Sequence, residues 1–268
     1  MYPRCTQATA QGAEAIIGNG YFQNVASNYI TIVIAIIVGA VIYQFSRRRS
    51  LLSFFGCSKT RRIRLYLSNL YIPPFAATDP SGLPRSFEGS AIPGYELPFV
   101  PAIFRLFLAP VPGLSDQPGW WKALALRDVE IDASPSPRSV ADIDESATLI
   151  TVGSGGYNVV SREVEENFQP SVQVEPGAPF QVTSPDVQYQ GPEYAIVAKC
   201  RHPSREQWAF YVAGASQFGT TSAFNYLIQN WSSLRKQFGD ESPFAVTIRV
   251  IEDDPSRREI VHRYRHLP

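Results

Sequence analysis

Residues 25–45 form an uncharged and mostly aliphatic run, and Arg47, Arg48 and Arg49 follow it at once. At 1.5 Å per residue, a helix of that length would be roughly 31 Å long, about the thickness of a bilayer's hydrocarbon core. A buried helix of a soluble domain is the alternative, but such helices usually keep a polar face. We therefore expect a transmembrane helix over residues 25–45, with the lipid bilayer as its partner.

The charges on the two sides of this run are unequal. Arg4 and Glu14 are the only charged residues before it, whereas a basic cluster follows it between residues 47 and 64. Because cytoplasmic flanks carry the excess of Lys and Arg, we expect a single-pass cell-membrane protein with its N-terminus outside and its main domain cytoplasmic. A cleaved signal peptide is the alternative, but the run lacks a basic segment directly before it and a small-residue cleavage site after it. The sequence therefore favours a signal anchor.

The composition excludes two classes of site. The 24 basic and 24 acidic residues balance, which gives nucleic-acid binding no electrostatic support. The three cysteines and three histidines have no metal-ligand spacing, so we expect no metal site and no disulfide framework. Cys57, shortly after the apolar run, is either a small unmodified residue or a site of palmitoylation.

The remainder of the chain is long enough for one globular core. We expect a first strand at 63–72, a long loop at 73–95, a helix within 96–108 and a short strand at 127–132. The expected organisation is a short extracytoplasmic N-terminus (1–24), the transmembrane helix (25–45), a basic juxtamembrane linker (46–62), a cytosolic α/β domain (63–251) and a polar C-terminal tail (252–268).

From residue 147 onwards the pattern becomes strand, glycine loop and helix, twice. A β-branched strand at 147–152 runs into a first glycine loop and a helix over 159–168. A strand pair, 194–199 and 207–213, then runs into a second glycine loop, a strongly amphipathic helix and a last strand at 244–251. Strands that alternate with helices predict a Rossmann-like α/β fold with a mainly parallel sheet.

The two glycine loops are candidates for a binding site. A loop between a strand and a helix offers free backbone N–H groups at the positive end of the helix dipole, and glycines let an anion approach. At the carboxyl edge of a parallel sheet the two loops would face one crevice, which suits a phosphorylated small molecule or a nucleotide. The candidate ligand-binding residues are Gly153, Ser154, Gly155, Gly156, Asn158 and Ser161 in the first loop, Gly214, Ser216, Gly219, Thr220 and Thr221 in the second, and Lys199 as a source of positive charge.

The same residues are also compatible with purely structural roles. Neither loop matches the dinucleotide fingerprint or a Walker A loop, and both could be tight turns in which Ser and Thr cap helices. Lys199 could equally be a surface lysine. Glu96, Asp144, Glu145, Glu163 and Glu193 are carboxylates available for catalysis, but their spacing selects no pair, and Ser154 does not meet the Gly-x-Ser-x-Gly pattern. The sequence therefore assigns no catalytic residue.

Two segments resemble a known group of proteins. Gly-Ser-Gly-Gly-Tyr-Asn-Val-Val-Ser at 153–161 and Ala-Gly-Ala-Ser-Gln-Phe-Gly-Thr-Thr-Ser-Ala at 213–223 are similar to the paired loops of a mostly uncharacterised bacterial and archaeal domain family. This chain has Gly156 where that family commonly has proline. The resemblance covers roughly residues 147–251 and implies a Rossmann-like fold with a shared crevice, without implying an activity. One span before such a domain is also similar in architecture to membrane effectors of bacterial antiphage signalling.

These observations lead to three hypotheses of different classes. The first is a bacterial membrane sensor or effector whose cytosolic domain binds a phosphorylated small molecule or nucleotide and self-associates as a homo-oligomer. The second is a membrane-tethered nucleotide hydrolase or transferase. The third is a structural module for protein interaction.

Overall fold

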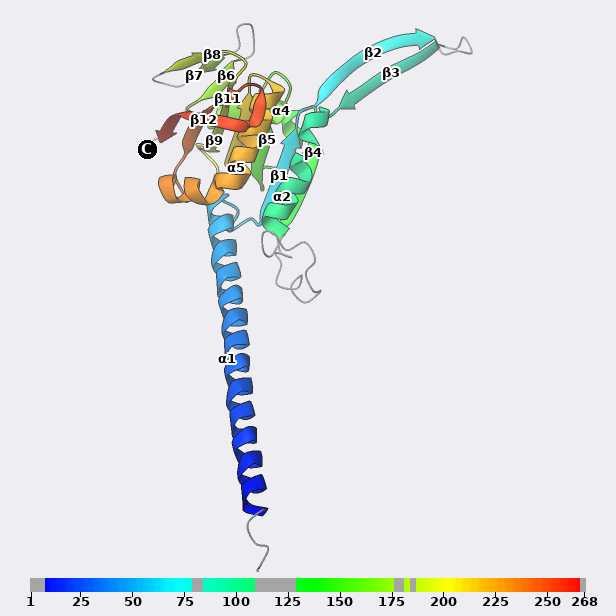
Figure 1. The fold of residues 1–268 in the computed structure, drawn as a ribbon. Helices are drawn as coiled ribbons and strands as arrows, with labels where there is room; N and C mark the ends of the chain where they lie inside the picture. The colour runs from blue at the N-terminus through cyan, green and yellow to red at the C-terminus, as the bar shows by residue number, and fades with distance from the viewer. Residues whose placement is uncertain (1–7, 79–83, 109–128, 176–180, 184–186, 266–268) are drawn as a thin grey trace, which may run out of the picture. The chain divides into compact units, whose positions relative to one another are not determined.

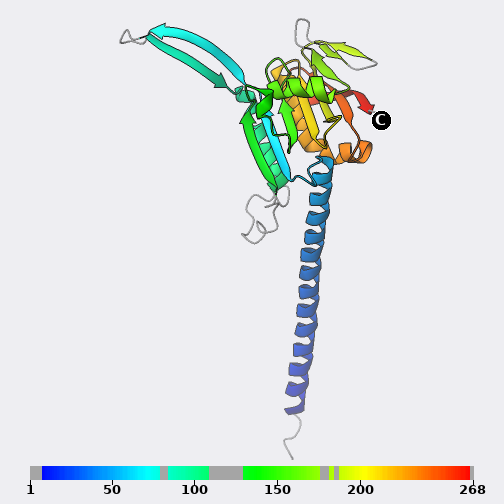
Figure 2. The ribbon, with the colours of Figure 1, turned by 180° about the vertical axis from the view of Figure 1, so that it is seen from behind.

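The computed structural model describes residues 8–78, 84–108, 129–175, 181–183 and 187–265, including most of their side chains (Figures 1 and 2). The chain divides into two compact units, Met1–Arg47 and Arg48–Pro268. A single helix, α1 (Ala8–Phe54), makes up the described part of the first unit and continues into the second. Within α1, the segment from Ser27 onwards is long and apolar enough to cross a membrane.

The end of α1 differs from the expected linker. Residues 46–62 were expected to connect the span to the domain, but the helix continues to Phe54 and its last residues belong to the second unit. Leu51, Phe54 and Phe55 are completely buried in the core of that unit. Residues 51–55 are mostly apolar and pack against an aromatic core. A linker exposed to solvent would instead be polar.

The second unit is built on a seven-stranded sheet in the order β12-β11-β9-β10-β5-β1-β4. The strands β1 (Arg62–Leu67), β4 (Glu130–Pro135), β5 (Thr148–Val152) and β10 (Trp208–Gly214) are consecutive parallel neighbours. β9 (Tyr194–Arg201) is antiparallel to β10 and to β11 (Phe244–Ile251), and β12 (Asp254–Arg265) is antiparallel to β11. Five of the seven strands therefore run in one direction, which confirms the expected α/β domain with a mostly parallel sheet.

Helices cover one face of this sheet and mixed elements cover the other (Figures 1 and 2). The first face packs against the end of α1, α2 (Phe99–Leu108) and α5 (Gln217–Phe238). The second face packs against α4 (Val159–Glu163), the π-helical turn η3 (Val164–Phe168) and buried valines of a small sheet. That small sheet consists of β6 (Gln173–Glu175), β7 (Gln181–Thr183) and β8 (Gln188–Gln190).

Helix α5 follows its sequence pattern closely. Its apolar face buries Phe224, Leu227 and Leu234 against the sheet, as the spacing predicts. The helix ends at Gly239, whose φ of +89° lies in a region that glycine adopts without strain. The last predicted strand, 244–251, coincides with β11.

Three segments differ from expectation. The expected loop at 73–95 contains the antiparallel pair β2 (Leu70–Thr78) and β3 (Pro84–Ala91), while residues 79–83 lie outside the described part. The expected helix at 159–168 ends as an α-helix at Glu163 and continues as the π-helical turn. Residues 254–265, expected to belong to a polar tail, form the edge strand β12, whose side chains are half-buried or exposed. The 3-10 turns η1 (Gly94–Glu96) and η2 (Val140–Asp142) complete the described elements.

Candidate functional site at the carboxyl edge of the sheet

The two glycine loops lie side by side, as expected. Each follows the carboxyl end of a strand, and the two strands β5 and β10 are parallel neighbours with Val152 opposite Val212. The N–H of Gly153 donates to the carbonyl of Val212 across the ends of these strands (2.9 Å). The loops therefore share the edge where α/β proteins bind ligands.

The strand order places a reversal of the chain at the same edge. From β1 the chain goes outwards to β4 and then returns to β5 on the other side of β1. In open α/β sheets such a switch point leaves a crevice beyond the carboxyl ends of the two central strands. Here the residues that follow those ends are Ser68 after β1 and Gly153 after β5.

The side chains of the first loop are engaged within the protein. Asn158 is buried and makes four hydrogen bonds: its amide donates to two backbone carbonyls, and its oxygen accepts from the N–H groups of Val160 and Ser161 as an N-cap. The Ser161 hydroxyl lies 2.6 Å from both Gly153 O and Thr151 Oγ1. These two residues hold the loop in its conformation and have no donor left for a phosphate.

The backbone donors of the first loop are also largely engaged. The N–H of Gly155 donates to the carboxylate of Glu165 (3.0 Å), and the N–H of Val159 donates to the Ser136 hydroxyl (2.9 Å). α4, which has five residues, follows the loop. The Ser154 hydroxyl makes no hydrogen bond that the structure describes, and Gly156 is exposed. A closed hydrogen-bond network of this kind is not the set of free donors that an anion requires.

In the second loop the glycines serve close packing. A Cβ on Gly214 would lie 2.3 Å from the backbone nitrogen of Thr220 and 2.5 Å from the carbonyl carbon of Gly219, so only glycine fits where β10 meets α5. Ser216 caps α5 by accepting from the N–H of Gly219 (3.2 Å), and the hydroxyl of the buried Thr220 donates to the Ser216 carbonyl (3.1 Å). Thr221 is half-buried in the first turn of the helix.

The most unusual group at this edge is Glu96, which sequence reasoning did not single out as a site residue. It is completely buried at the end of η1, and its Oε2 accepts from the backbone N–H of Ser68 (2.7 Å). Its Oε1 has no hydrogen-bond partner among the described residues. A methyl group on Gly153 would stand 3.8 Å from that oxygen, so Glu96 lies at the switch point between β1 and β5.

The environment of Glu96 shifts the pKa of its carboxyl group. Burial raises the pKa of its carboxyl group, while hydrogen bonding by Ser68 opposes that shift. Tyr95 is half-buried beside it, and burial together with the Glu96 charge raises the pKa of the Tyr95 hydroxyl. In the sequence, Glu96 is visible only as an acidic residue between two partly apolar segments. Its spacing from Ser68 does not predict that the two residues are in contact.

A second carboxyl group, which is half-buried, lies on the other side of the same loop. Glu165 Oε1 accepts from the Gly155 N–H and from the hydroxyl of the buried Tyr211. Burial raises the pKa of Glu165, and these two hydrogen bonds and the nearby Arg162 oppose that shift. The loop 153–158 is thus flanked by two carboxyl groups whose pKa values are raised by burial.

Lys199 does not belong to this edge, which corrects the expectation that it supplies charge to the crevice. Tyr194, the first residue of β9, lies beside the second loop, since its carbonyl accepts from Ala215 (3.0 Å). Lys199 is five residues further along the strand, roughly 17 Å away at 3.3–3.4 Å per residue. Its Nζ is buried and donates to the carbonyl of Phe54 (2.6 Å), the last residue of α1. The cause is that β9 runs antiparallel to β10, so its carboxyl end lies at the opposite edge of the sheet.

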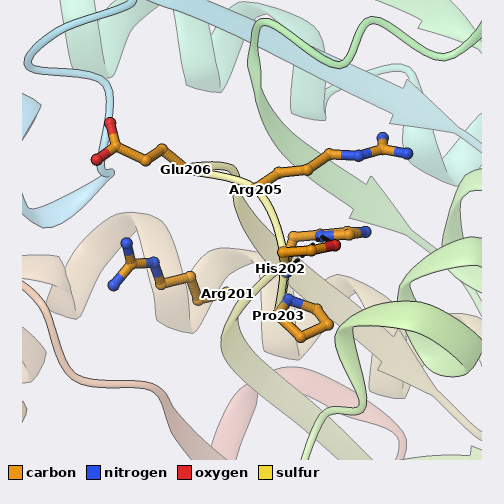
Figure 3. A pocket seen from close by; sticks show the side chains of 6 residues that line it. Arg201, His202, Pro203, Arg205 and Glu206 are labelled. Atoms are coloured by element: carbon orange, nitrogen blue, oxygen red, sulfur yellow. Dashed lines mark hydrogen bonds between the residues drawn. The ribbon is translucent and has the colours of Figure 1, made fainter.

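A shallow hollow of about 440 Å³ lies at that opposite edge, over the turn between β9 and β10 (Figure 3). The guanidinium groups of Arg201 and Arg205 point to opposite sides of it. Arg205 pairs with Glu145 (2.6 Å), and Glu206 pairs with Lys59 (2.9 Å). The hollow therefore lacks a convergent set of groups. Among the described residues, no cluster of His, Cys, Asp and Glu is arranged to hold a metal ion.

Comparisons with protein-family models, with curated proteins and with solved structures found no match for this chain. The geometry of the switch point is therefore the basis for assigning a function.

Proposed function

We propose that this chain is a single-pass membrane sensor or effector with a Rossmann-like cytosolic domain that binds a nucleotide-like ligand at the carboxyl edge of its sheet. The observation that carries the proposal is Glu96, a fully buried carboxyl group with one unpartnered oxygen at the switch point. Buried polar atoms without partners are uncommon in proteins, and one at a ligand-binding edge favours a role in recognition.

The strand order supports a Rossmann-like assignment. Without the antiparallel β9, the order β4-β1-β5-β10-β11 follows the doubly wound order 2-1-3-4-5. Proteins with that order bind their ligands outside the carboxyl ends of the first and third strands. Those strands correspond to β1 and β5, which is where Glu96 and Ser68 lie.

The available groups favour a ligand that brings hydrogen-bond donors. The free oxygen of Glu96 accepts, whereas the N–H groups of the first loop are mostly engaged with Asn158, Glu165 and Ser136. Two carboxyl groups beside the loop would also repel a phosphate whenever they are ionised. We therefore propose that the ligand is held through the hydroxyl groups of a sugar or the amino group of a base, and not chiefly through its phosphates.

This ligand class leads to a direct binding test. Calorimetry on the full-length protein in detergent micelles would compare adenosine, guanosine and uridine, their 5′-monophosphates, and inorganic phosphate. We expect at least one nucleoside to bind with an affinity within about tenfold of that of its monophosphate. In this binding mode the phosphate group contributes less than about 1.4 kcal/mol to the binding free energy. Phosphate alone should not bind. Tight binding of a monophosphate with none by its nucleoside would contradict this mode and favour a phosphate cradle at the loops.

The matched variants for this test are Glu96→Gln and Glu166→Gln. Both replace a carboxylate by an amide, but Glu96 is buried at the switch point and Glu166 is exposed on η3. We expect Glu96→Gln to weaken nucleoside binding by roughly ten- to hundredfold, since a hydrogen bond to a charged group contributes about 1.5–3 kcal/mol. Glu166→Gln should bind as the wild type does. Equal binding by all three proteins would remove Glu96 from the site and leave the interaction module as the better hypothesis.

A membrane-tethered hydrolase or transferase is the second candidate. It is favoured by the two carboxyl groups with raised pKa values that flank the loop to which Ser154 belongs. A carboxyl group that keeps its proton near neutral pH can act as a general acid. Mass spectrometry of the nucleotide after prolonged incubation separates the two candidates: intact ligand favours the sensor, and cleaved or transferred ligand favours the enzyme.

The proposed topology has its own test. Cys57 and Cys200 are buried, so they contribute little background to thiol labelling. In a Cys5→Ser background, Ser233→Cys on the exposed face of α5 should react with an impermeant maleimide only after the cells are permeabilised. The wild-type Cys5 should react in intact cells. Labelling of the residue-233 cysteine in intact cells would reverse the orientation and remove the case for an intracellular ligand.

A further inference from the structure

Lys199 is the most completely buried cation among the described residues. It lies in β9 between Phe210 of β10 and Phe244 of β11, and it is 1% exposed. A buried lysine is rare, because moving an ammonium group out of water is costly unless it is paired and hydrogen-bonded. Its partners therefore indicate what the lysine does.

The partners of Lys199 are two backbone carbonyls from separate parts of the chain. One is the carbonyl of Phe54 at the end of α1 (2.6 Å), and the other is the carbonyl of Asp240 in the turn between α5 and β11. Aromatic rings surround the same nitrogen, which is 4.3 Å from the centre of the Trp208 ring and 5.2 Å from that of Phe54. The amine thus contacts both the end of α1 and the turn after α5, and among the described residues no carboxylate is its direct partner.

The end of α1 also packs tightly around this point. Gly56 follows the helix with a φ of +68°, and a Cβ there would lie 2.2 Å from the Trp208 ring. The N–H groups of Phe55, Gly56 and Cys57 donate back to α1 carbonyls over 2.9–3.0 Å. We call residues 51–57 together with Lys199 and Trp208 the helix joint.

Few charges face Lys199 from the surrounding elements. On the α5–β11 side are Asp240 and Glu241, and the carboxylate of Asp240 is already held by Arg235 at 2.6 and 2.9 Å. Cys57 lies just after the end of α1, and burial raises the pKa of its thiol. Arg201 belongs to β9 and lies over the same Trp208 ring. None of these groups is hydrogen-bonded to the Lys199 ammonium through its side chain.

We propose that the helix joint is a proton-linked contact between the end of α1 and the sheet of the second unit, in which protonation of Lys199 loosens the docking of residues 51–57. One of the two carbonyl partners of the amine, Phe54, belongs to the docked segment, so the amine loses that partner and gains access to water when the joint opens. This proposal is independent of the ligand proposed above, because the joint lies at the opposite edge of the sheet.

The direction of the effect follows from the two states of the lysine. In the docked joint, burial lowers the pKa of Lys199 from 10.5 to about 7, and the charges of Asp240, Glu241 and Cys57 only partly oppose that shift. In an open joint the amine meets water and keeps its ordinary value. Between about pH 7 and 10.5 the open state therefore binds more protons, so docking strengthens as the pH rises. The docking constant should change by up to about tenfold per pH unit in this window and should be constant below it.

Hydrogen exchange on the full-length protein in nanodiscs measures this directly. The reporters are the amides of Phe55, Gly56 and Cys57, and the reference is the amides of residues 224–230 in α5. After correction for intrinsic exchange, the protection of the reporters relative to the reference should rise up to about tenfold per unit between pH 7.5 and 9.5. In Lys199→Met this rise should vanish. In Lys236→Met, which removes an exposed lysine from α5, it should persist.

Two results of the exchange experiment would overturn the proposal: wild-type protection that does not depend on pH, or an equal dependence in Lys199→Met. If Lys199→Met does not fold, the wild type still decides the question. The chain has four lysines, and labelling their ε-carbons for NMR would follow each titration. One resonance with a midpoint near pH 7 is expected. Four midpoints above pH 9.5 would overturn the proposal.

Discussion

Replacing Asn158 with alanine should lower the free energy of unfolding by roughly 3–4 kcal/mol, one of the largest single effects we expect in this domain. The side chain donates to Tyr66 O (3.2 Å) and Val152 O (2.8 Å), which are carbonyls at the ends of β1 and β5. It also caps α4 through Val160 N and Ser161 N at 2.9 and 3.2 Å. Alanine would leave several of these groups buried without partners. Guanidinium denaturation of the full-length protein in micelles, followed by tryptophan fluorescence, would measure the loss.

Asn230→Ala is the matched control. Asn230 makes one hydrogen bond, to the carbonyl of Tyr226 on its own helix α5 (3.1 Å), at a half-buried position. Its loss should change the free energy of unfolding by no more than about 0.5 kcal/mol, as is usual for substitutions away from a buried network. Similar stabilities of the two variants would mean that the loop after β5 does not depend on Asn158.

Gly214→Ala should lower the free energy of unfolding by about 2–4 kcal/mol through a steric clash. The added methyl group would meet three backbone atoms of the first turn of α5: Thr220 N, Gly219 C and Gly219 Cα, at 2.3, 2.5 and 2.8 Å. Backbone atoms cannot rotate away as a flexible side chain can, so α5 would have to shift against β10. Thermal unfolding followed by circular dichroism would report the change.

Gly94→Ala serves as the control for this clash. A methyl group at Gly94 would have no neighbour within 4 Å, and this glycine does not need a positive φ. Its effect should stay within about 0.5 kcal/mol. If Gly214→Ala were as stable as Gly94→Ala, the contact between β10 and α5 would be looser than described, and close packing would not be the role of the glycine in the second loop.

Much of the domain could be predicted from the sequence, because its local patterns agree with its tertiary contacts. The run 148–152 consists of strand formers and is buried throughout as β5. The spacing of Phe224, Leu227 and Leu234 fixed both the type and the buried face of α5. The prediction that the two glycine loops meet depended only on the parallel arrangement of β5 and β10, which the alternation of strands and helices indicates.

The rest depended on contacts between distant residues. Glu96 contacts Ser68 only because η1 lies beside the end of β1, and the spacing of the two residues in the sequence does not indicate that contact. Lys199 was assigned to the wrong edge because the direction of β9 could not be read from its own residues. The polar residues 254–265 form a strand because β11 offers an edge, and local composition gave no sign of that partner. The expected linker included both the basic residues 47–49 and the apolar residues that follow them. The prediction therefore missed that Leu51 and Phe54 belong to the core.

The burial of the end of α1 also sets the order of events during synthesis. Phe54 is in contact with Phe210 and Phe244, and its carbonyl is bound by a lysine that is translated 145 residues later. At about 5–20 residues per second, that lysine follows Phe54 by roughly 7–30 s. The apolar helix therefore leaves the ribosome long before its aromatic end has anything to pack against. During that interval the exposed aromatic cluster at the end of α1 is a target for chaperones or for aggregation. A nascent chain that ends before β11 cannot bury this cluster completely.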